Sequence, residues 1–374
     1  MATLETTFAG LKLKNPIIIS SSGLTDSAAK NQKLYEAGAG AIVLKSLFEE
    51  QIMMEADWLG DPNMYPEGSD YLVGYIREHK LGEYLNLIKE TKKVCDIPVI
   101  ASINCYQDAD WIEFARKIEE AGADALEVNI LALQTDIQYA YGSFEQRHID
   151  ILSHIRKTVN IPVIMKLGDN LTNPIALIDQ LYANGAAAVV MFNRFYQPDI
   201  DIEKMAQSAG SVFSTDADLS KSLRWIGIAS AAVSKLDYAA SGGIHAPEGV
   251  VKAILAGASA VEICSALYQN SYAIIEEYVR FLGHKAGQQR HRSLPRSKAR
   301  RFENRRQKAS DHPKHTAFAI RCKMHRKIKA LQEPQQYAHS ENQRGCFFDK
   351  MLYFIPDMAQ RALESGHSVR RKLK

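Results

Sequence analysis

One local pattern recurs four times in the first 282 residues and constrains the fold more than any other feature. At each place a glycine follows a helix-like stretch, and small residues lead directly into a short apolar run. A glycine there is typical of a helix that ends just before a β-strand begins. The glycines are separated by 84, 63 and 72 residues, and each interval has room for two strand–helix units. The four positions are Gly38, Gly122, Gly185 and Gly257.

Apolar, Val/Ile-rich runs occupy both the four repeats and the intervals between them. Continuous apolar runs of this kind are typical of strands that are buried on both faces of a parallel sheet. Eight strand–helix units in about 250 residues match the size of a (β/α)₈ barrel, and a doubly wound open sheet is the alternative. We predict an α/β fold, a TIM barrel, with helices such as 108–122, 173–185 and 246–257. The predicted strands are 15–23, 42–46, 97–104, 126–130, 161–168, 189–193, 236–243 and 261–265.

Composition excludes several classes of protein. The chain has 374 residues, 46% apolar and 24% charged, which is ordinary for a globular enzyme. No run approaches the roughly 18 apolar residues of a membrane helix, and the start lacks a basic and apolar leader, so we expect a cytoplasmic protein with no membrane partner. The five cysteines include no Cys-x-x-Cys pair, so we expect neither disulfides nor a metal site.

The net charge of +3 hides two different segments. Residues 283–374 hold 23 Lys and Arg against 7 Asp and Glu, a net charge of +16, whereas residues 1–282 carry −13. We therefore predict a barrel domain at 1–282 and a basic C-terminal tail at 283–374. The tail has no nucleic-acid-binding motif, so a disordered tail and a shifted reading frame are both preferred over binding to nucleic acid.

The carboxyl ends of the predicted strands carry the polar residues of this otherwise apolar set. Active sites of such barrels lie at these ends, and a buried lysine or amide needs a ligand or a neighbour. Gly242, Gly243 and Ser265 follow the last two strands, where backbone N–H groups can hold a phosphate. The alternative is a tight turn that merely requires glycine.

Two lysines and three asparagines stand at other strand ends. Lys45 and Lys166 can neutralise an anion on a flavin or a substrate, or form a Schiff base. Pairing with an acid is the alternative: Glu127 for Lys166, and nearby loop glutamates for Lys45. Asparagine amides suit the donor–acceptor edge of a flat heterocycle, although they also cap loops. These asparagines are Asn104, Asn129 and Asn193.

Taken together, these motifs resemble the dihydroorotate dehydrogenase family in its short class 1 form. The matching segments include TTFAGLKLKNPII, GAIVLKS, the MKLG lysine, SGGI and CSAL. The resemblance implies an FMN-dependent oxidation of dihydroorotate to orotate in pyrimidine biosynthesis, with reoxidation by a soluble acceptor such as fumarate. It also implies that Asn129 and Asn193 face an orotate-like ring; the family includes dimers, so a homodimer is one expected assembly. The implied FMN-binding residues are Ser22, Gly23, Lys45, Ser46, Asn104, Asn129, Lys166, Gly242, Gly243 and Ser265.

The sequence departs from the family where the substrate proton would be removed. The family places Cys or Ser there as the base, and this chain has Ala132, which cannot accept a proton. Lys45 and Cys105 remain as catalytic candidates, although Cys105 is also readily explained as a small buried residue. Arg194 stands where a serine is expected and can clamp a carboxylate or remain a solvated charge. Alternative functions are a flavin reductase for another pyrimidine or an enone, and a non-catalytic flavin or nucleotide binder whose tail contacts nucleic acid.

Overall fold

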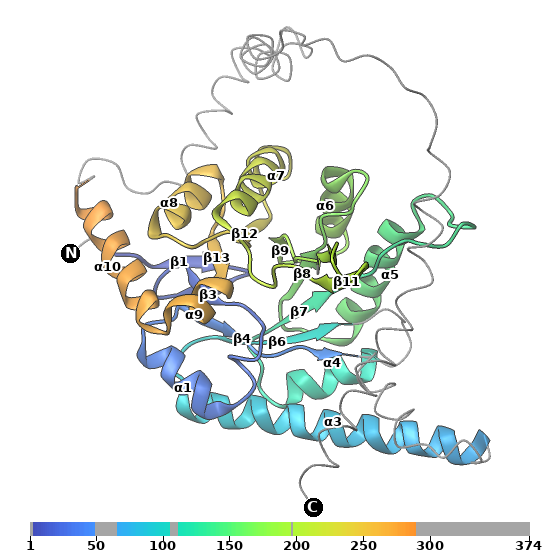
Figure 1. The fold of residues 1–374 in the computed structure, drawn as a ribbon. Coiled ribbons are helices and arrows are strands. Elements are labelled where there is room, and N and C mark those ends of the chain that lie inside the picture. The colour runs from blue at the N-terminus through green and yellow to red at the C-terminus, as the bar shows by residue number, and fades with distance from the viewer. Residues whose placement is uncertain (1–2, 49–65, 105–110, 196, 289–374) are drawn as a thin grey trace, which may run out of the picture. The chain divides into compact units, whose positions relative to one another are not determined.

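A computed structural model describes residues 3–48, 66–104, 111–195 and 197–288. Eight parallel strands within this part of the chain form a closed barrel (Figure 1). Each strand pairs with two neighbours, and the ring closes where the strand at 41–43 pairs with the strand at 99–104. The α/β barrel prediction is thus confirmed, and the open sheet is excluded. The eight strands are β3 (Ile17–Ile19), β4 (Ala41–Val43), β6 (Val99–Asn104), β7 (Ala125–Asn129), β8 (Val163–Leu167), β9 (Ala188–Met191), β12 (Asp237–Ser241) and β13 (Ala260–Ile263).

Three neighbouring pairings complete the ring. Strand β4 pairs with β3 on one side and with β6 on the other, while β13 pairs with β3. A two-residue strand, β5 (Leu47–Phe48), then continues beside the end of β6. Between β4 and β5 the Tyr84 hydroxyl accepts a hydrogen bond from Ser102 N at 2.7 Å and donates one to Ser102 O at 3.0 Å. The phenol thereby satisfies the backbone of β6 where the neighbouring strand is interrupted.

Helices surround the strands, each placed between one strand and the next (Figure 1). The three predicted helices are confirmed with shorter bounds, as α4, α6 and α8. All four glycines of the repeated pattern have positive φ, from +91° to +124°, as expected where a helix ends. The helices are α1 (Ala28–Glu36), α3 (Pro66–Val94), α4 (Trp111–Glu120), α5 (Ser143–Thr158), α6 (Pro174–Ala183), α7 (Leu219–Ala232), α8 (Pro247–Ala256), α9 (Ser265–Asn270) and α10 (Ala273–Gln288), with a short 3₁₀ helix η1 (Asp216–Asp218).

Two antiparallel hairpins supplement the barrel. The first joins β1 (Thr6–Phe8) and β2 (Leu11–Leu13), and its Phe8 and Leu13 pack into a buried cluster with residues from all eight barrel strands. This hairpin fills the amino-terminal end of the barrel and leaves the opposite end for a site. The second joins β10 (Pro198–Asp201) and β11 (Ala206–Ala209), between β9 and η1.

The barrel unit is separate from a second unit to which residues 134–139 belong. Within those six residues, a turn is closed by a hydrogen bond from Tyr139 N to Asp136 O at 3.1 Å. Helix α10 runs to Gln288, past the predicted boundary at 282, and the division between barrel and tail stays a prediction. None of the described helices combines the length and apolar character needed to cross a bilayer.

Candidate functional site

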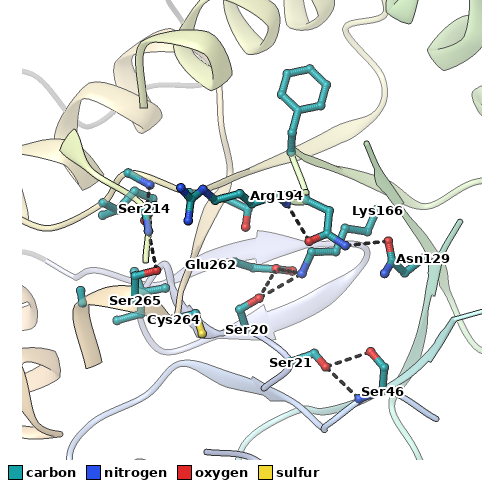
Figure 2. A pocket seen from close by; sticks show the side chains of 18 of the residues that line it. Ser20, Ser21, Ser46, Asn129, Lys166, Arg194, Ser214, Glu262, Cys264 and Ser265 are labelled. Atoms are coloured by element: carbon teal, nitrogen blue, oxygen red, sulfur yellow. Dashed lines mark hydrogen bonds and ion pairs between the residues drawn. The ribbon is translucent and has the colours of Figure 1, made fainter. Parts of the chain in front are cut away.

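A pocket lies at the carboxyl ends of the barrel strands. Its cavity volume is about 240 Å³, just below the range of about 300–1,000 Å³ that is usual for small-molecule sites. Strand ends from β3, β7, β8, β12 and β13 contribute to its wall, together with residues 192–194 and 212–214 (Figure 2). The barrel therefore brings side chains from across the sequence to one cavity, as its topology predicts.

A buried cluster of charges forms the floor of this pocket. Lys166 Nζ lies 2.6 Å from Glu262 Oε2, 3.4 Å from Glu127 Oε1 and 3.0 Å from Ser20 Oγ. Ser20 also donates to Glu262 at 3.0 Å. The lysine is 5% exposed and the two glutamates 1–2%. Three acceptors for the three N–H groups of Lys166 explain how the barrel tolerates a buried ammonium.

The pKa values of the two carboxyls in the floor are shifted in opposite directions. Burial, followed by repulsion from Glu262, raises the pKa of Glu127 well above its usual value. Burial also acts to raise the pKa of Glu262, but attraction to Lys166 and hydrogen bonds outweigh it and leave that pKa lowered. Burial would lower the pKa of Lys166, and the two glutamates raise it instead. The shifts favour a proton on Glu127 over one on Glu262, with Lys166 as the ammonium that both carboxyls contact.

A row of serine hydroxyls leads from this floor to the pocket wall. Ser102 Oγ donates to Glu127 Oε1 at 3.4 Å and lies 2.7 Å from Ser46 Oγ. Ser46 Oγ lies in turn 2.9 Å from Ser21 Oγ, which also accepts a hydrogen bond from Ser46 N at 2.8 Å (Figure 2). The row crosses four neighbouring positions of the ring, from β7 through β6 to the segments after β4 and β3.

Two amides stand together on another part of the wall. Asn193 Nδ2 donates to Asn129 Oδ1 at 3.0 Å, and Asn193 Oδ1 accepts from Arg194 N at 2.8 Å (Figure 2). The Arg194 side chain reaches the carbonyls of Ser211 and Val212, at 3.0 and 2.8 Å from Nη1. These contacts orient both amides at the pocket and connect them to the segment that follows β11.

Backbone groups and hydroxyls meet at the end of β12. Gly243 N donates to Ser214 Oγ at 3.1 Å, and Ser214 N donates to Ser265 Oγ at 3.1 Å. Ser214 Oγ also lies 3.0 Å from His245 Nε2. A Cβ on Gly243 would overlap the backbone of Leu219 and would lie 2.9 Å from Thr215 O, while its φ is +75°. Glycine at 243 is thus required by this close approach. We call Gly243, Ser214 and Ser265 the cradle.

The pocket includes most of the residues that the sequence indicated, but not all. Ser22, Gly23, Lys45 and Asn104 do not line it; the Lys45 side chain is exposed, and the Ser22 hydroxyl accepts from Leu24 N at 3.2 Å. Cys105 lies outside the described residues. The predicted residues that line the pocket are Ser46, Asn129, Lys166, Asn193, Arg194, Gly242, Gly243 and Ser265.

Sequence reasoning missed several polar residues of the site. Glu262 is the nearest partner of Lys166, whereas pairing with an acid such as Glu127 was only an alternative to ligand binding. A single acidic residue inside the apolar run 261–265 was the available signal for Glu262. Ser102 and Ser21 were visible as strand-end hydroxyls without an assigned role, and Ser214 had no signal because it lies in a long connection.

Comparison with known proteins assigns the barrel to a family. The profile of dihydroorotate dehydrogenase matches residues 3–285. The chain is 30% identical over 285 residues to the catalytic subunit of dihydroorotate dehydrogenase B (NAD(+)) from Thermoplasma volcanium, covering 74% of this chain and 91% of the relative. It is 25% identical over 309 residues to the NAD-dependent dihydropyrimidine dehydrogenase subunit PreA from Escherichia coli K12, covering 75% and 72%. The chain belongs to the dihydroorotate dehydrogenase family of flavin oxidoreductases.

Proposed function

We propose that this protein binds FMN in the pocket and exchanges a hydride between the flavin and a C–C bond next to a carbonyl in a pyrimidine-type ring. The observation that carries the proposal is the meeting of the cradle, the buried Lys166 cluster and the Asn129–Asn193 pair around one cavity in a barrel of this family. Bound FMN supplies a hydride acceptor and donor, which none of the twenty side chains provides.

The cradle fits the phosphate of FMN. Gly243 N–H and the hydroxyls of Ser214 and Ser265 are donors gathered at a turn that only glycine permits, and such turns are suited to anions. We propose that a phosphate accepts from Gly243 N–H and Ser265 Oγ in place of the Ser214 hydroxyl. Ser46 and the Lys166 cluster would then contact the heterocycle, and the cluster would hold one face of the ring against the barrel interior.

The paired amides and Arg194 suit a carboxylated pyrimidine. Each amide offers a donor and an acceptor, which matches the alternating groups of such a ring. The Arg194 guanidinium has five N–H donors, and the two bonds to loop carbonyls come from Nη1, so it retains donors for a substrate carboxylate. This arrangement supports dihydroorotate or a related ring as the substrate.

One observation favours a second substrate. Ala132 cannot remove a proton, and its carbonyl accepts from Asn170 Nδ2 at 2.9 Å. A flavin reductase acting on another pyrimidine or on an enone needs no base at this position, but hydride addition to a C=C bond requires a proton, which would come from water because Ala132 cannot donate one. The name of the PreA relative also refers to a dihydropyrimidine.

The absorbance spectrum of the purified protein tests the proposal. We expect visible flavin bands that are lost on acid release and restored by added FMN. A colourless protein that takes up no FMN contradicts flavin binding. A yellow protein whose flavin reacts with no dihydropyrimidine or enone binds the flavin but lacks the proposed activity.

Anaerobic mixing distinguishes the substrates. If dihydroorotate removes the absorbance bands of the oxidised flavin, the family reaction is supported. If orotate analogues or enones restore these bands in protein whose flavin was first reduced, the reductase is supported. Fumarate and NAD(+) should then be compared as acceptors, since fumarate is implied by the class 1 resemblance and NAD(+) appears in the names of the relatives.

A further inference from the structure

The row of hydroxyls links the pocket to a carboxyl that sequence reasoning did not assign to the site. It runs from Glu127 Oε1 through Ser102 and Ser46 to Ser21, with successive distances of 3.4, 2.7 and 2.9 Å. Glu127 is 1% exposed and Ser102 fully buried, whereas Ser21 is half-buried at the pocket wall. Glu127 also lines the pocket, at its floor and closed off from solvent, whereas Ser21 lies at the wall, where it would meet another part of the bound molecule.

The two outer links of the row can pass a proton in either direction, whereas in the inner link Ser102 Oγ donates to Glu127 Oε1, a bond that reverses when the carboxyl is protonated. Hydroxyls both donate and accept, and either Ser46 or its neighbour can be the donor in the two short contacts. Tyr84 holds the backbone N–H and C=O of Ser102, so the central hydroxyl is fixed in position by a residue of α3. A continuous, held row of donors and acceptors is what proton transfer between a buried acid and a ligand requires.

The charges around Glu127 suit a proton that can leave and return. Lys166 and Glu262 face it from β8 and β13, and Tyr84 faces it from α3. Burial and repulsion from Glu262 raise the pKa of Glu127, so this carboxyl keeps a proton to higher pH than an ordinary glutamate does. After that proton leaves, Lys166 still lies within 3.4 Å of the resulting carboxylate and stabilises it.

We propose that Glu127 is the proton store of this site and that Ser102, Ser46 and Ser21 conduct its proton to a nitrogen of the heterocycle bound in the pocket. This inference rests on the proposed function, in which that heterocycle is reduced by a hydride or by an external reductant. The O–H bond of Glu127 breaks, each serine accepts one proton and passes on its own, and a new N–H bond forms on the reduced heterocycle. The electrons come from the reductant, and the reverse transfer reprotonates Glu127 on oxidation.

The proposed path carries a proton to the flavin, which is a different step from the removal of a substrate proton for which segment 130–133 has no base. That segment is Ile130, Leu131, Ala132 and Leu133, and none of these side chains can hold a proton. A redox reaction that moves a hydride also moves a proton, and within the described residues the serine row is a built connection between a titratable group and the pocket.

Two variants separate the store from the path. Ser102→Ala interrupts the row but leaves Glu127 and the outer serines in place. We therefore expect proton uptake by the reduced flavin from Glu127, followed by the absorbance of the reduced flavin after rapid mixing with dithionite, to slow at least tenfold. The reduction potential of the flavin should keep its dependence on pH, because a path changes rates and not equilibria. Ser102→Thr, which keeps the hydroxyl, should restore much of the rate.

Glu127→Gln removes the store and keeps the shape of the protonated acid. We expect the potential of the bound flavin to lose the break in its pH dependence that the wild-type protein shows where Glu127 titrates. The matched control is Ser153→Ala on α5, remote from the pocket, which should leave both rate and potential unchanged. The infrared C=O band of a buried carboxylic acid should be present in the wild type, with or without FMN, and absent in Glu127→Gln.

Opposite results overturn the proposal separately from the proposed function. Equal proton-uptake rates in Ser102→Ala and wild type exclude the row as the path. A pH break that persists in Glu127→Gln, or a missing infrared band in the wild type, excludes Glu127 as the store. Failure to bind FMN at all contradicts the proposed function, and the infrared band still decides whether Glu127 holds a proton.

Discussion

The floor of the pocket and the segment that follows β7 differ in their side chains, which are ionisable in the floor and apolar in the segment. The floor holds three buried ionisable side chains, with Lys166 Nζ 2.6 Å from Glu262 and 3.4 Å from Glu127. Segment 130–133, which begins one residue after Asn129, is apolar, and Leu133 is 60% exposed. Under the proposed function, the floor would contact the bound ring, and segment 130–133 offers no side chain that removes a proton.

The largest effect should come from breaking the floor. Lys166→Met leaves two buried carboxyls without their ammonium, and removing one partner of a buried ion pair typically costs about 3–5 kcal/mol in the free energy of unfolding. Urea unfolding measures this, and the difference from wild type should shrink at low pH as Glu262 is protonated. Lys221→Met, at an exposed lysine paired with Asp169, should cost no more than about 1 kcal/mol. Equal losses in the two variants would show that the floor is not a stabilising cluster.

Segment 130–133 can be altered to resemble the family. Ala132→Cys introduces a proton acceptor where the family has one, and general-base catalysis contributes about 10²–10⁴-fold. We expect dihydroorotate to bleach the bound flavin at least about 100-fold faster in this variant. Ala132→Val, which adds bulk without a proton acceptor, serves as control. If both variants behave like wild type, proton removal at this position does not limit the reaction.

The cradle provides a matched pair of glycines. Gly243→Ala would bring a Cβ into the backbone of Leu219, whereas a Cβ on Gly242 meets nothing within 4 Å, and both have positive φ. We expect FMN affinity to fall at least about tenfold for Gly243→Ala and only about threefold for Gly242→Ala, which suffers backbone strain alone. Titration of apoprotein with FMN, followed by flavin fluorescence, measures both. Similar losses would place the phosphate elsewhere.

The raised pKa of Glu127 predicts a pH-dependent difference in stability. Between the ordinary glutamate pKa of about 4.3 and the raised value, the folded protein holds a proton that the unfolded chain has lost. Wild-type stability should therefore fall relative to Glu127→Gln by about 1.4 kcal/mol per pH unit in this window and level off above it. Ser153→Ala, which removes no titratable group, should show a nearly constant difference from wild type. A flat difference for Glu127→Gln would mean that its carboxyl is ionised at rest.

The smallest effect is expected at Lys45. Its side chain is exposed and does not line the pocket, so Lys45→Ala should change FMN affinity by less than about twofold. A loss of tenfold or more in the same titration would show that this lysine reaches the cofactor in the loaded protein, as the family resemblance implies.

The sequence by itself determined the barrel and the edge at which the site lies. Four glycines at helix ends and eight apolar runs follow from backbone conformation and burial, which are local properties, and all of them appear where predicted. The same reasoning placed Asn129, Lys166, Gly243 and Ser265 at one end of the barrel, because parallel strands present their carboxyl ends together.

Only the tertiary structure decided which of these side chains meet. Glu262 contacts Lys166 across 96 positions of sequence, and Ser102 lies beside Ser46 across 56. Such pairs depend on the stagger between strands and on the inward or outward direction of each residue, and a change of one position in register reverses that direction. The position of Ser214 depends on a long connection whose path no local pattern encodes. Local preferences therefore predict the elements of this protein, while the charge and proton arrangement of its site comes from how those elements pack.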